Sequence, residues 1–371
     1  MKKINMLDLS EQYQNMKEEM LGIIDDVLSS SRYILGDNVK TFEQNVADYS
    51  NATFGIGVGN GSDAIHIALQ AAGVKEGDEV ITVPFTFFAT AGSIVRAGAI
   101  PVFIDIDPIT YNMDPAKIEE AITDKTKAII PVHLYGQMAD MAEINRISKK
   151  YNLVIIEDAA QAIGSEYQGY KPGELSAAAT YSFFPTKNLG AYGDGGMIIT
   201  SRSELADKSR VIRVHGSKPK YHHHVLGYNS RLDEIQAAVL NVKLKKLSEF
   251  NQRRRSRAIY YTEKLSNLLS DYVIVPIEKK GNYHVYHQYT IRVNNRDELQ
   301  SFLIENGINT MVYYPMPLHL QPVFNNLGYS EGEFPVSEKM THEVLSLPMY
   351  PELKVEEQDY IIEKIVEFYK G

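Results

Sequence analysis

The sequence predicts an α/β fold in which helices cover both faces of a mostly parallel sheet. Short apolar runs alternate with segments of helical spacing through the first two thirds of the chain, and the pattern changes near Asp233. Several of the runs are apolar on both faces, as strands buried in a parallel sheet are. Alternation of strands and helices of this kind is typical of layered α/β domains.

Six apolar runs are the strand candidates of the first two thirds. They are EVITV (79–83), PVFIDI (101–106), KAIIPVHL (127–134), LVIIED (153–158), ATYSFF (179–184) and GGMIIT (195–200). Between them, residues 62–72 place Ile65, Ala68, Leu69 and Ala72 on one helical stripe. The spacing predicts further helices over 115–122 and 141–151.

The last third has a different organisation. One long helix is expected over 233–257, followed by a Tyr-rich strand at 286–293 and helices at 296–305 and 355–369. We therefore expect a large domain over 1–245 and a small C-terminal α+β domain over 246–371. The sequence leaves open whether the first segment, about 30 residues, packs on the small domain.

Composition excludes several classes of protein. The 371 residues carry a net charge of −9, which argues against wrapping nucleic acid or an anionic membrane. Cysteine is absent, so disulfides, thiolate nucleophiles and Cys-ligated metals are excluded. The consecutive histidines at 222–224 point in different directions, so no metal site is expected. Without an apolar run of about 18–20 residues or a signal peptide, we expect a cytoplasmic protein.

The first motif that could carry chemistry is GIGVGNGSDA (55–64). Gly59, Gly61 and Ser62 open the first predicted helix, where free amides and the positive helix end make a phosphate cradle. A dinucleotide fingerprint fits less well, because the ribose-binding acid is missing and Asp78 falls in a turn. Glycines that serve only a tight turn remain an alternative.

The second motif is IIEDAAQA (155–162), an apolar strand that ends on acids. Active-site acids of open α/β sheets lie at the carboxyl ends of strands. Asp158 is thus a candidate to hold a ring nitrogen or a metal. A helix N-cap explains this residue equally well.

The third motif is YSFFPTKNLGAYGDGG (181–196), which places Lys187 just after a strand and before a run of glycines. Glycines allow close approach of the backbone to a ligand. A lysine at the edge of an apolar pocket can lose its proton and form a Schiff base. A solvated surface charge is the alternative.

The three motifs together supply what pyridoxal 5′-phosphate (PLP) requires. The cofactor needs a phosphate site, an acid on its pyridine nitrogen and a Schiff-base lysine. Ser62, Asp158 and Lys187 provide these groups in that order. The sequence therefore predicts a PLP enzyme.

The same segments give the chain a resemblance to a known family. The segments, in order, are YILGDNVKTFE, GNGSDAI, PFTFFAT, IIEDAAQAIG, SFFPTKNLGAYGDGG and GYNSRLDEIQAA. With them the sequence resembles the DegT/StrS-type nucleotide-sugar aminotransferases, and the resemblance covers nearly the whole chain. It implies the aspartate-aminotransferase fold, PLP fold type I.

The resemblance implies roles for residues around the cofactor ring. Lys187 would form the Schiff base and act as the catalytic residue. Asp158 would pair with the pyridine nitrogen, and Gln161 would contact the hydroxyl side of the ring. Phe87 would stack on the ring face, with Phe88 the weaker candidate.

The resemblance also implies the phosphate site and the assembly. Gly61, Ser62 and Ser182 would hold the phosphate. Asn229 would reach the phosphate of the partner subunit, which implies a homodimer with shared active sites. Some relatives carry His at the Schiff-base position and are dehydratases, which remove a hydroxyl group instead of transferring an amine. The lysine at position 187 argues against this dehydratase branch of the family.

Residues 214–234 look closest to enzymes that act on carbon 3 of dTDP-3-keto-6-deoxyhexoses. The resemblance thus implies transfer of an amino group from L-glutamate to such a sugar. Action on carbon 4 or on a UDP-ketosugar stays open, because those relatives share the PLP motifs. A non-catalytic PLP-binding regulator is a more distant alternative, and a nicotinamide dehydrogenase is more distant still.

Substrate contacts are expected from three further segments. Tyr33 lies in a stretch that resembles a family segment near the substrate entrance. His223, rather than His222, is the histidine expected near the sugar. Tyr313, Tyr314 and His319 are expected to line the sugar pocket, although a packed Pro-rich loop explains them equally well.

Overall fold

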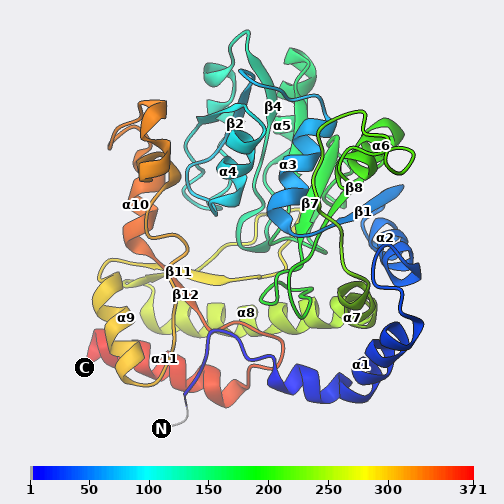
Figure 1. Cartoon of the computed structure of the whole chain (residues 1–371). Coiled ribbons are helices and arrows are strands. Elements are labelled where there is room, and N and C mark those ends of the chain that lie inside the picture. The colour runs from blue at the N-terminus through cyan, green and yellow to red at the C-terminus, as the bar shows by residue number, and fades with distance from the viewer. Residues whose placement is uncertain (1–2) are drawn as a thin grey trace.

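A computed structural model describes residues 3–371 of the chain (Figure 1). The main sheet has the strand order β1-β8-β7-β5-β4-β2-β3, and β8 runs antiparallel to both of its neighbours. The other neighbouring pairs are parallel. The strands are β1 (Phe54–Val58), β2 (Glu79–Thr82), β3 (Ile100–Phe103), β4 (Thr126–Ile129), β5 (Val154–Asp158), β7 (Ala178–Ser182) and β8 (Gly196–Thr200). The predicted α/β class with a mostly parallel sheet is confirmed.

Helices cover both faces of this sheet. Neighbouring residues of a strand point to opposite faces, so they pack against different helices. Ile156 of β5 packs in one cluster with residues of α3 (Gly61–Ala71), α4 (Ala89–Arg96) and α6 (Ser203–Ile212). Ile155 packs with α5 (Met141–Tyr151) on the other side. The opposite face of β7 and β8 carries α2 (Asp37–Tyr49) and α7 (Glu234–Leu244).

Each of the six predicted runs overlaps a strand of the main sheet, but β1 of this sheet was not predicted. Its sequence FGIGV holds two glycines, which weaken a strand signal. The structure shows why Gly55 is there: a Cβ at this position would lie 2.3 Å from the backbone oxygen of Glu43 in α2. Close packing of α2 on an edge strand is a tertiary demand that the local pattern does not reveal.

Two helix predictions are wrong. Residues 115–122 form two separate 3₁₀ turns, η1 (Pro115–Lys117) and η2 (Glu119–Ala121), in which amides bond the carbonyl three residues back, as Lys117 does to Asp114 and Ala121 to Ile118. The long helix expected over 233–257 is broken at Lys245 and Lys246, where α7 ends and α8 (Leu247–Leu269) begins. Figure 1 shows the two helices running in different directions.

The last third forms a small antiparallel sheet flanked by helices. β12 (Val344–Leu347), β11 (Tyr289–Val293) and β9 (Val273–Ile274) pair in that order. The helices are α8, α9 (Arg296–Glu305), α10 (Pro335–Glu343) and α11 (Val355–Lys370), and a two-stranded pair joins β6 (Glu166–Tyr167) to β10 (Asn282–Tyr283). A domain boundary near residue 245 would fall in the break between α7 and α8 and stays a prediction.

The N-terminal segment divides its contacts. Ile4 bridges to Ile308 and packs in the apolar cluster of the last third. Helix α1 (Ser10–Ser30) instead packs on α7, with Met16 and Met20 against Val239. Within residues 3–371, no helix is long and apolar enough to cross a membrane.

Candidate active site

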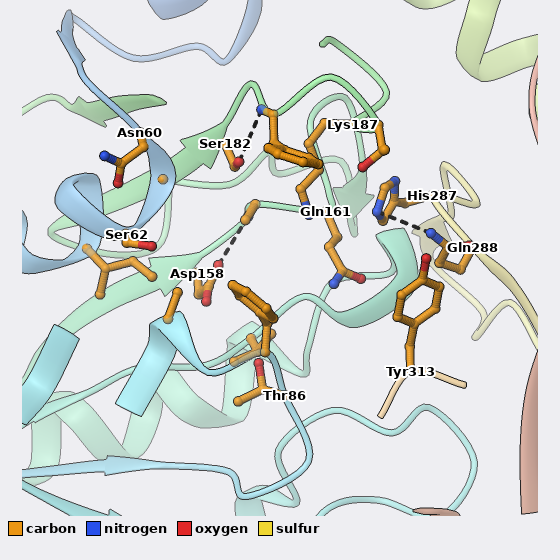
Figure 2. A pocket seen from close by; sticks show the side chains of 18 of the residues that line it. Asn60, Ser62, Thr86, Asp158, Gln161, Ser182, Lys187, His287, Gln288 and Tyr313 are labelled. Carbon is orange, nitrogen blue, oxygen red and sulfur yellow. Dashed lines mark hydrogen bonds between the residues drawn. The ribbon is translucent and has the colours of Figure 1, made fainter. Parts of the chain in front are cut away.

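A cavity of about 530 Å³ lies where β5 and β7 end and α3 begins (Figure 2). Most of the predicted site residues line it: Gly61, Ser62, Phe87, Asp158, Gln161, Ser182, Lys187 and Tyr313. Asn60 and Ser62 lie at one end in Figure 2, and Gln161, His287 and Tyr313 lie at the other. The cavity is therefore at the sheet edge where ligands of open α/β sheets bind.

The first turn of α3 forms an anion cradle. The side chain of Asn60 caps this turn by accepting a hydrogen bond from the Asp63 amide at 2.8 Å. The amides of Gly61 and Ser62 have no intrahelical acceptor, since the first N–H groups of a helix lack one. A Cβ at Gly61 would lie 2.7 Å from Cβ of Ser182, so glycine allows β7 to end against α3. The free amides and the Ser182 hydroxyl fit a phosphate.

Replacing Gly61 by alanine is expected to weaken PLP binding by about tenfold or more, because the added methyl group pushes Ser182 out of the cradle. Titration of the cofactor-free variant with PLP, followed by absorbance, measures this change. Gly22→Ala is the matched control, because no atom lies within 4 Å of a Cβ there and α1 is exposed at this position. Equal PLP affinity in both variants would contradict the cradle.

Asp158 is a buried carboxylate held by neutral donors. Its side chain is 5% exposed, Thr90 Oγ1 donates to Oδ2 at 2.7 Å, and the Ala160 amide donates to Oδ1 at 3.2 Å. Thr86 shares the hydroxyl network at 3.1 Å from Thr90. No salt bridge compensates this carboxylate among the described residues, so its charge is available to a protonated ring nitrogen.

The orientation of Gln161 is set by two bonds. The Tyr135 amide donates to Oε1 at 2.7 Å, and Nε2 donates to the Tyr314 hydroxyl at 3.1 Å. Phe87 lines the cavity beside Tyr314, with ring centroids 6.1 Å apart, whereas Phe88 packs on Phe324 away from it. Of the two phenylalanines, only Phe87 is in place to cover a ring in the cavity.

Lys187 follows β7 and extends into the cavity. Its side chain makes no salt bridge or hydrogen bond among the residues that the structure describes. Burial lowers the pKa of Lys187 to about 8, although the Asp158 charge partly opposes this change. About a tenth of the amine is therefore neutral, and thus nucleophilic, at pH 7, far more than for an ordinary lysine.

Several lining residues were not predicted. They are Asn60, Ile65, Thr86, Ala89, Val132, Ala160, Phe184, Thr186, Asp194, His287 and Gln288. Thr86 lies within the motif PFTFFAT, and its hydroxyl group, next to the predicted ring-stacking Phe87, is the signal that could have identified it. His287 and Gln288 come from the segment before β11, and no local pattern links them to Lys187.

Other predicted residues lie outside the cavity of their own chain. His319 was expected to line the sugar pocket, but its side chain is buried, contacts Glu338 at 3.1 Å and packs on Phe334. It belongs to an aromatic cluster because packing of the Pro-rich loop turns it inward. Tyr33, His223 and Asn229 are exposed on the surface, and His223 Nδ1 lies 2.8 Å from the His215 carbonyl oxygen.

The distribution of these groups fits PLP: a helix-end cradle for a phosphate, a buried carboxylate and a lysine of lowered pKa facing one cavity. On this sheet, the arrangement defines a PLP-dependent enzyme of fold type I. Residues 14–366 match the DegT/DnrJ/EryC1/StrS aminotransferase family, and the chain belongs to it.

Three relatives match nearly the whole chain. The "Pleiotropic regulatory protein" of Geobacillus stearothermophilus is 67% identical over 367 residues, 99% of each chain. The UDP-N-acetyl-3-dehydro-alpha-D-glucosamine 3-aminotransferase of Acidithiobacillus ferrooxidans is 45% identical, with 95% of each chain covered. The dTDP-3-amino-3,6-dideoxy-alpha-D-galactopyranose transaminase of Aneurinibacillus thermoaerophilus is 44% identical, with 98% of each covered.

Solved structures agree with this assignment. DesV of S. venezuelae superposes with a TM-score of 0.97 at 38% identity over 100% of both chains. NtdA of Bacillus subtilis, solved with bound cofactor PMP, has a TM-score of 0.94 at 35% identity over 100% of this chain and 86% of that one. The protein is a PLP-dependent sugar aminotransferase, as the motifs predicted.

Proposed function

We propose that this enzyme transfers an amino group from L-glutamate to carbon 3 of a dTDP-3-keto-6-deoxyhexose, giving a dTDP-3-amino-3,6-dideoxyhexose. The observation that carries the choice of carbon is the similarity, at 45% and 44% identity, to two full-length enzymes whose names both place the amine at carbon 3. Their nucleotides differ, and the resemblance of residues 214–234 favours dTDP over UDP.

The binding residues have the following proposed roles. Lys187 attaches the cofactor covalently through Nζ, and the Gly61 and Ser62 amides with the Ser182 hydroxyl bind its phosphate. Asp158 keeps the pyridine nitrogen protonated through its buried charge. Bound PLP supplies a ring that accepts electrons from the carbon that loses its proton.

The proton transfer is assigned to the lysine. With Lys187 freed by an incoming amino acid, its neutral Nζ would take the α-proton as general base and would then deliver it to the cofactor carbon as general acid. Phe87 covers one face of the ring and Gln161 contacts its hydroxyl side, so both keep the reacting carbon in reach of Nζ. The same residues act in reverse order when the ketosugar takes up the amine.

The test is incubation with L-glutamate and a panel of dTDP- and UDP-linked 3-keto and 4-keto sugars, with the product regiochemistry determined by NMR. We expect amination at carbon 3 and the highest kcat/KM with a dTDP sugar. Lys187→Ala is the matched inactive control. Product aminated only at carbon 4, or turnover confined to UDP sugars, would refute the proposed substrate.

A regulatory role is the second candidate, because the relative at 67% identity carries the name of a regulatory protein. A regulator without catalysis would bind PLP but would not convert L-glutamate to 2-oxoglutarate. A single-turnover assay with glutamate separates the two candidates before any sugar is tested.

We also propose a homodimer in which Asn229 reaches the cofactor phosphate of the partner subunit. Asn229 is exposed, and its side chain lies outside the cavity of its own chain. Nearby, Leu226 is 92% exposed and Tyr221 is 79% exposed. Large apolar side chains at this exposure are typical of an interface.

Shared sites predict complementation between two damaged chains. Lys187→Ala lacks the amine, and Asn229→Asp places a negative charge against the partner's phosphate, so each variant alone is expected to be inactive at limiting PLP. After co-refolding, about a quarter of wild-type activity should return, because half of the dimers are mixed and each holds one intact site. Activity no higher than that of the separate variants would contradict sharing.

A further inference from the structure

His287 lies in the cavity but has no role in the proposed reaction. It comes from the segment before β11, is 5% exposed and lines the same wall region as Lys187 (Figure 2). Lys187 itself has no hydrogen-bond acceptor or ion pair among the described residues. An ammonium group in such a place is costly unless an acceptor is available when it forms.

A chain of amides fixes the tautomer of His287. Nδ2 of Asn188 donates to Oδ1 of Asn251 at 2.8 Å and to the Val285 carbonyl oxygen at 3.1 Å. Both of these oxygens accept hydrogen bonds, so the atom of the Asn188 amide that lies beside them must be the NH₂ nitrogen. The other amide atom, Oδ1, therefore lies 3.2 Å from His287 Nδ1. That nitrogen must donate, so in the neutral ring Nε2 carries the free lone pair.

The surroundings keep the ring neutral. Burial, followed by the positive charges of Lys187 and Arg254, lowers the pKa of His287 well below its ordinary value. Arg254 reaches it from α8 and donates to the His287 carbonyl oxygen at 3.3 Å. Asp158, at the end of β5, acts on Lys187 from the other side of the cavity. The groups that act on the imidazole are thus cations, and Nε2 remains an acceptor.

We propose that Nε2 of His287 accepts a hydrogen bond from Lys187 when the lysine, released from the cofactor, has taken up a proton and become an ammonium group. His287 is then a positioning residue that holds the freed lysine against the reacting carbon. Gln288 Nε2, at 3.5 Å from His287 Nε2, is a weak competitor that the ammonium can displace. The inference rests on the proposed role of Lys187 and adds to it.

Two amide substitutions separate the two nitrogens of the ring. In His287→Asn the side-chain nitrogen can take the place of Nδ1 and bond Asn188, but nothing replaces Nε2. In His287→Gln the amide oxygen can reach the place of Nε2, while the donor to Asn188 is lost. If His287 acts through Nε2, His287→Gln should retain more activity than His287→Asn. If His287 only holds Asn188 in place through Nδ1, His287→Asn should retain more activity than His287→Gln.

The first readout uses the cofactor-free enzyme. Removing an acceptor destabilises the ammonium form, so the pKa of Lys187 should be lower in His287→Asn than in the wild type and should stay near the wild-type value in His287→Gln. The rate at which Lys187 reacts with trinitrobenzenesulfonate, followed against pH with peptide mapping, measures this. At pH 7 we expect reaction several-fold faster in His287→Asn.

The second readout is the single-turnover half-reaction with L-glutamate. We expect the rate to fall by about tenfold or more in His287→Asn and by less than about threefold in His287→Gln, with similar PLP affinity. The reverse order, or two variants that match the wild type in both readouts, overturns the inference. Borohydride reduction with peptide mapping is run in parallel. A label on a lysine other than Lys187 would instead overturn the proposed function.

Discussion

Lys187→Ala is expected to lose covalent cofactor attachment and to reduce transamination by at least about four orders of magnitude. In the proposed function, the variant removes both the amine that attaches the cofactor and the base that moves the proton. Borohydride reduction of the PLP-loaded wild type, followed by peptide mapping, should label Lys187 and no residue in the variant. The PLP phosphate cradle is untouched, so the variant should still bind PLP without a covalent bond.

Lys243 supplies a matched control for this experiment. Burial lowers its pKa to about 8 as well, but Nζ donates to the Gly190 carbonyl oxygen at 2.8 Å outside the cavity. In Lys243→Met, borohydride reduction should therefore still label Lys187. In Lys187→Arg no label is expected at position 187, because a guanidinium stays protonated and cannot form the Schiff base. A persistent adduct in Lys187→Ala would refute the assignment.

The lowered pKa of Lys187 also predicts how cofactor uptake depends on pH. The neutral amine is the attacking species, and its fraction grows as pH rises through about 8. Covalent loading of the cofactor-free enzyme should therefore speed up across this range and level off above it. A lysine with its ordinary pKa would show the same rise only near 10.5.

Asp158→Asn is expected to lower the rate of the glutamate half-reaction by about two to three orders of magnitude. The amide keeps the shape of the side chain, and its oxygen can still accept from Thr90 or Ala160. It lacks the charge that, in the proposed role of Asp158, keeps the pyridine nitrogen protonated, so the ring should accept electrons less well. Stopped-flow absorbance of the PLP-loaded enzyme after mixing with L-glutamate measures the rate.

Two controls separate charge from packing at this site. Thr90→Val removes one neutral donor to Asp158 and should cost about tenfold or less. Asp158→Ala loaded with N-methylated PLP, whose ring nitrogen is permanently charged, should recover part of the lost rate. A wild-type rate in Asp158→Asn would show that the carboxylate charge is not needed.

The two largest predictions concern residues that the sequence identified without a structure. Asp158 is the last residue of a recognisable apolar strand, Lys187 follows another such strand, and Ser62 lies in the first turn of a recognisable helix. Ends of strands in a parallel sheet meet at one edge, so local patterns were enough to bring these groups together. The order of the motifs was enough to indicate the family.

Other features were decided only by tertiary packing. β1 reads as a glycine-rich loop until α2 is placed against it, and α7 and α8 read as one helix until their separate packing partners are known. His319 reads as a pocket histidine, but the aromatic cluster around Phe334 turns it away from the cavity.

The sequence by itself therefore determined the α/β class, the PLP chemistry and most of the predicted residues that line the cavity, because each rests on a short contiguous segment. The tertiary structure alone decided that His287 lies in the cavity with Lys187 and that Asn188 and Asn251 fix its tautomer. Contacts between segments so far apart depend on how the whole core packs, and no local spacing records that.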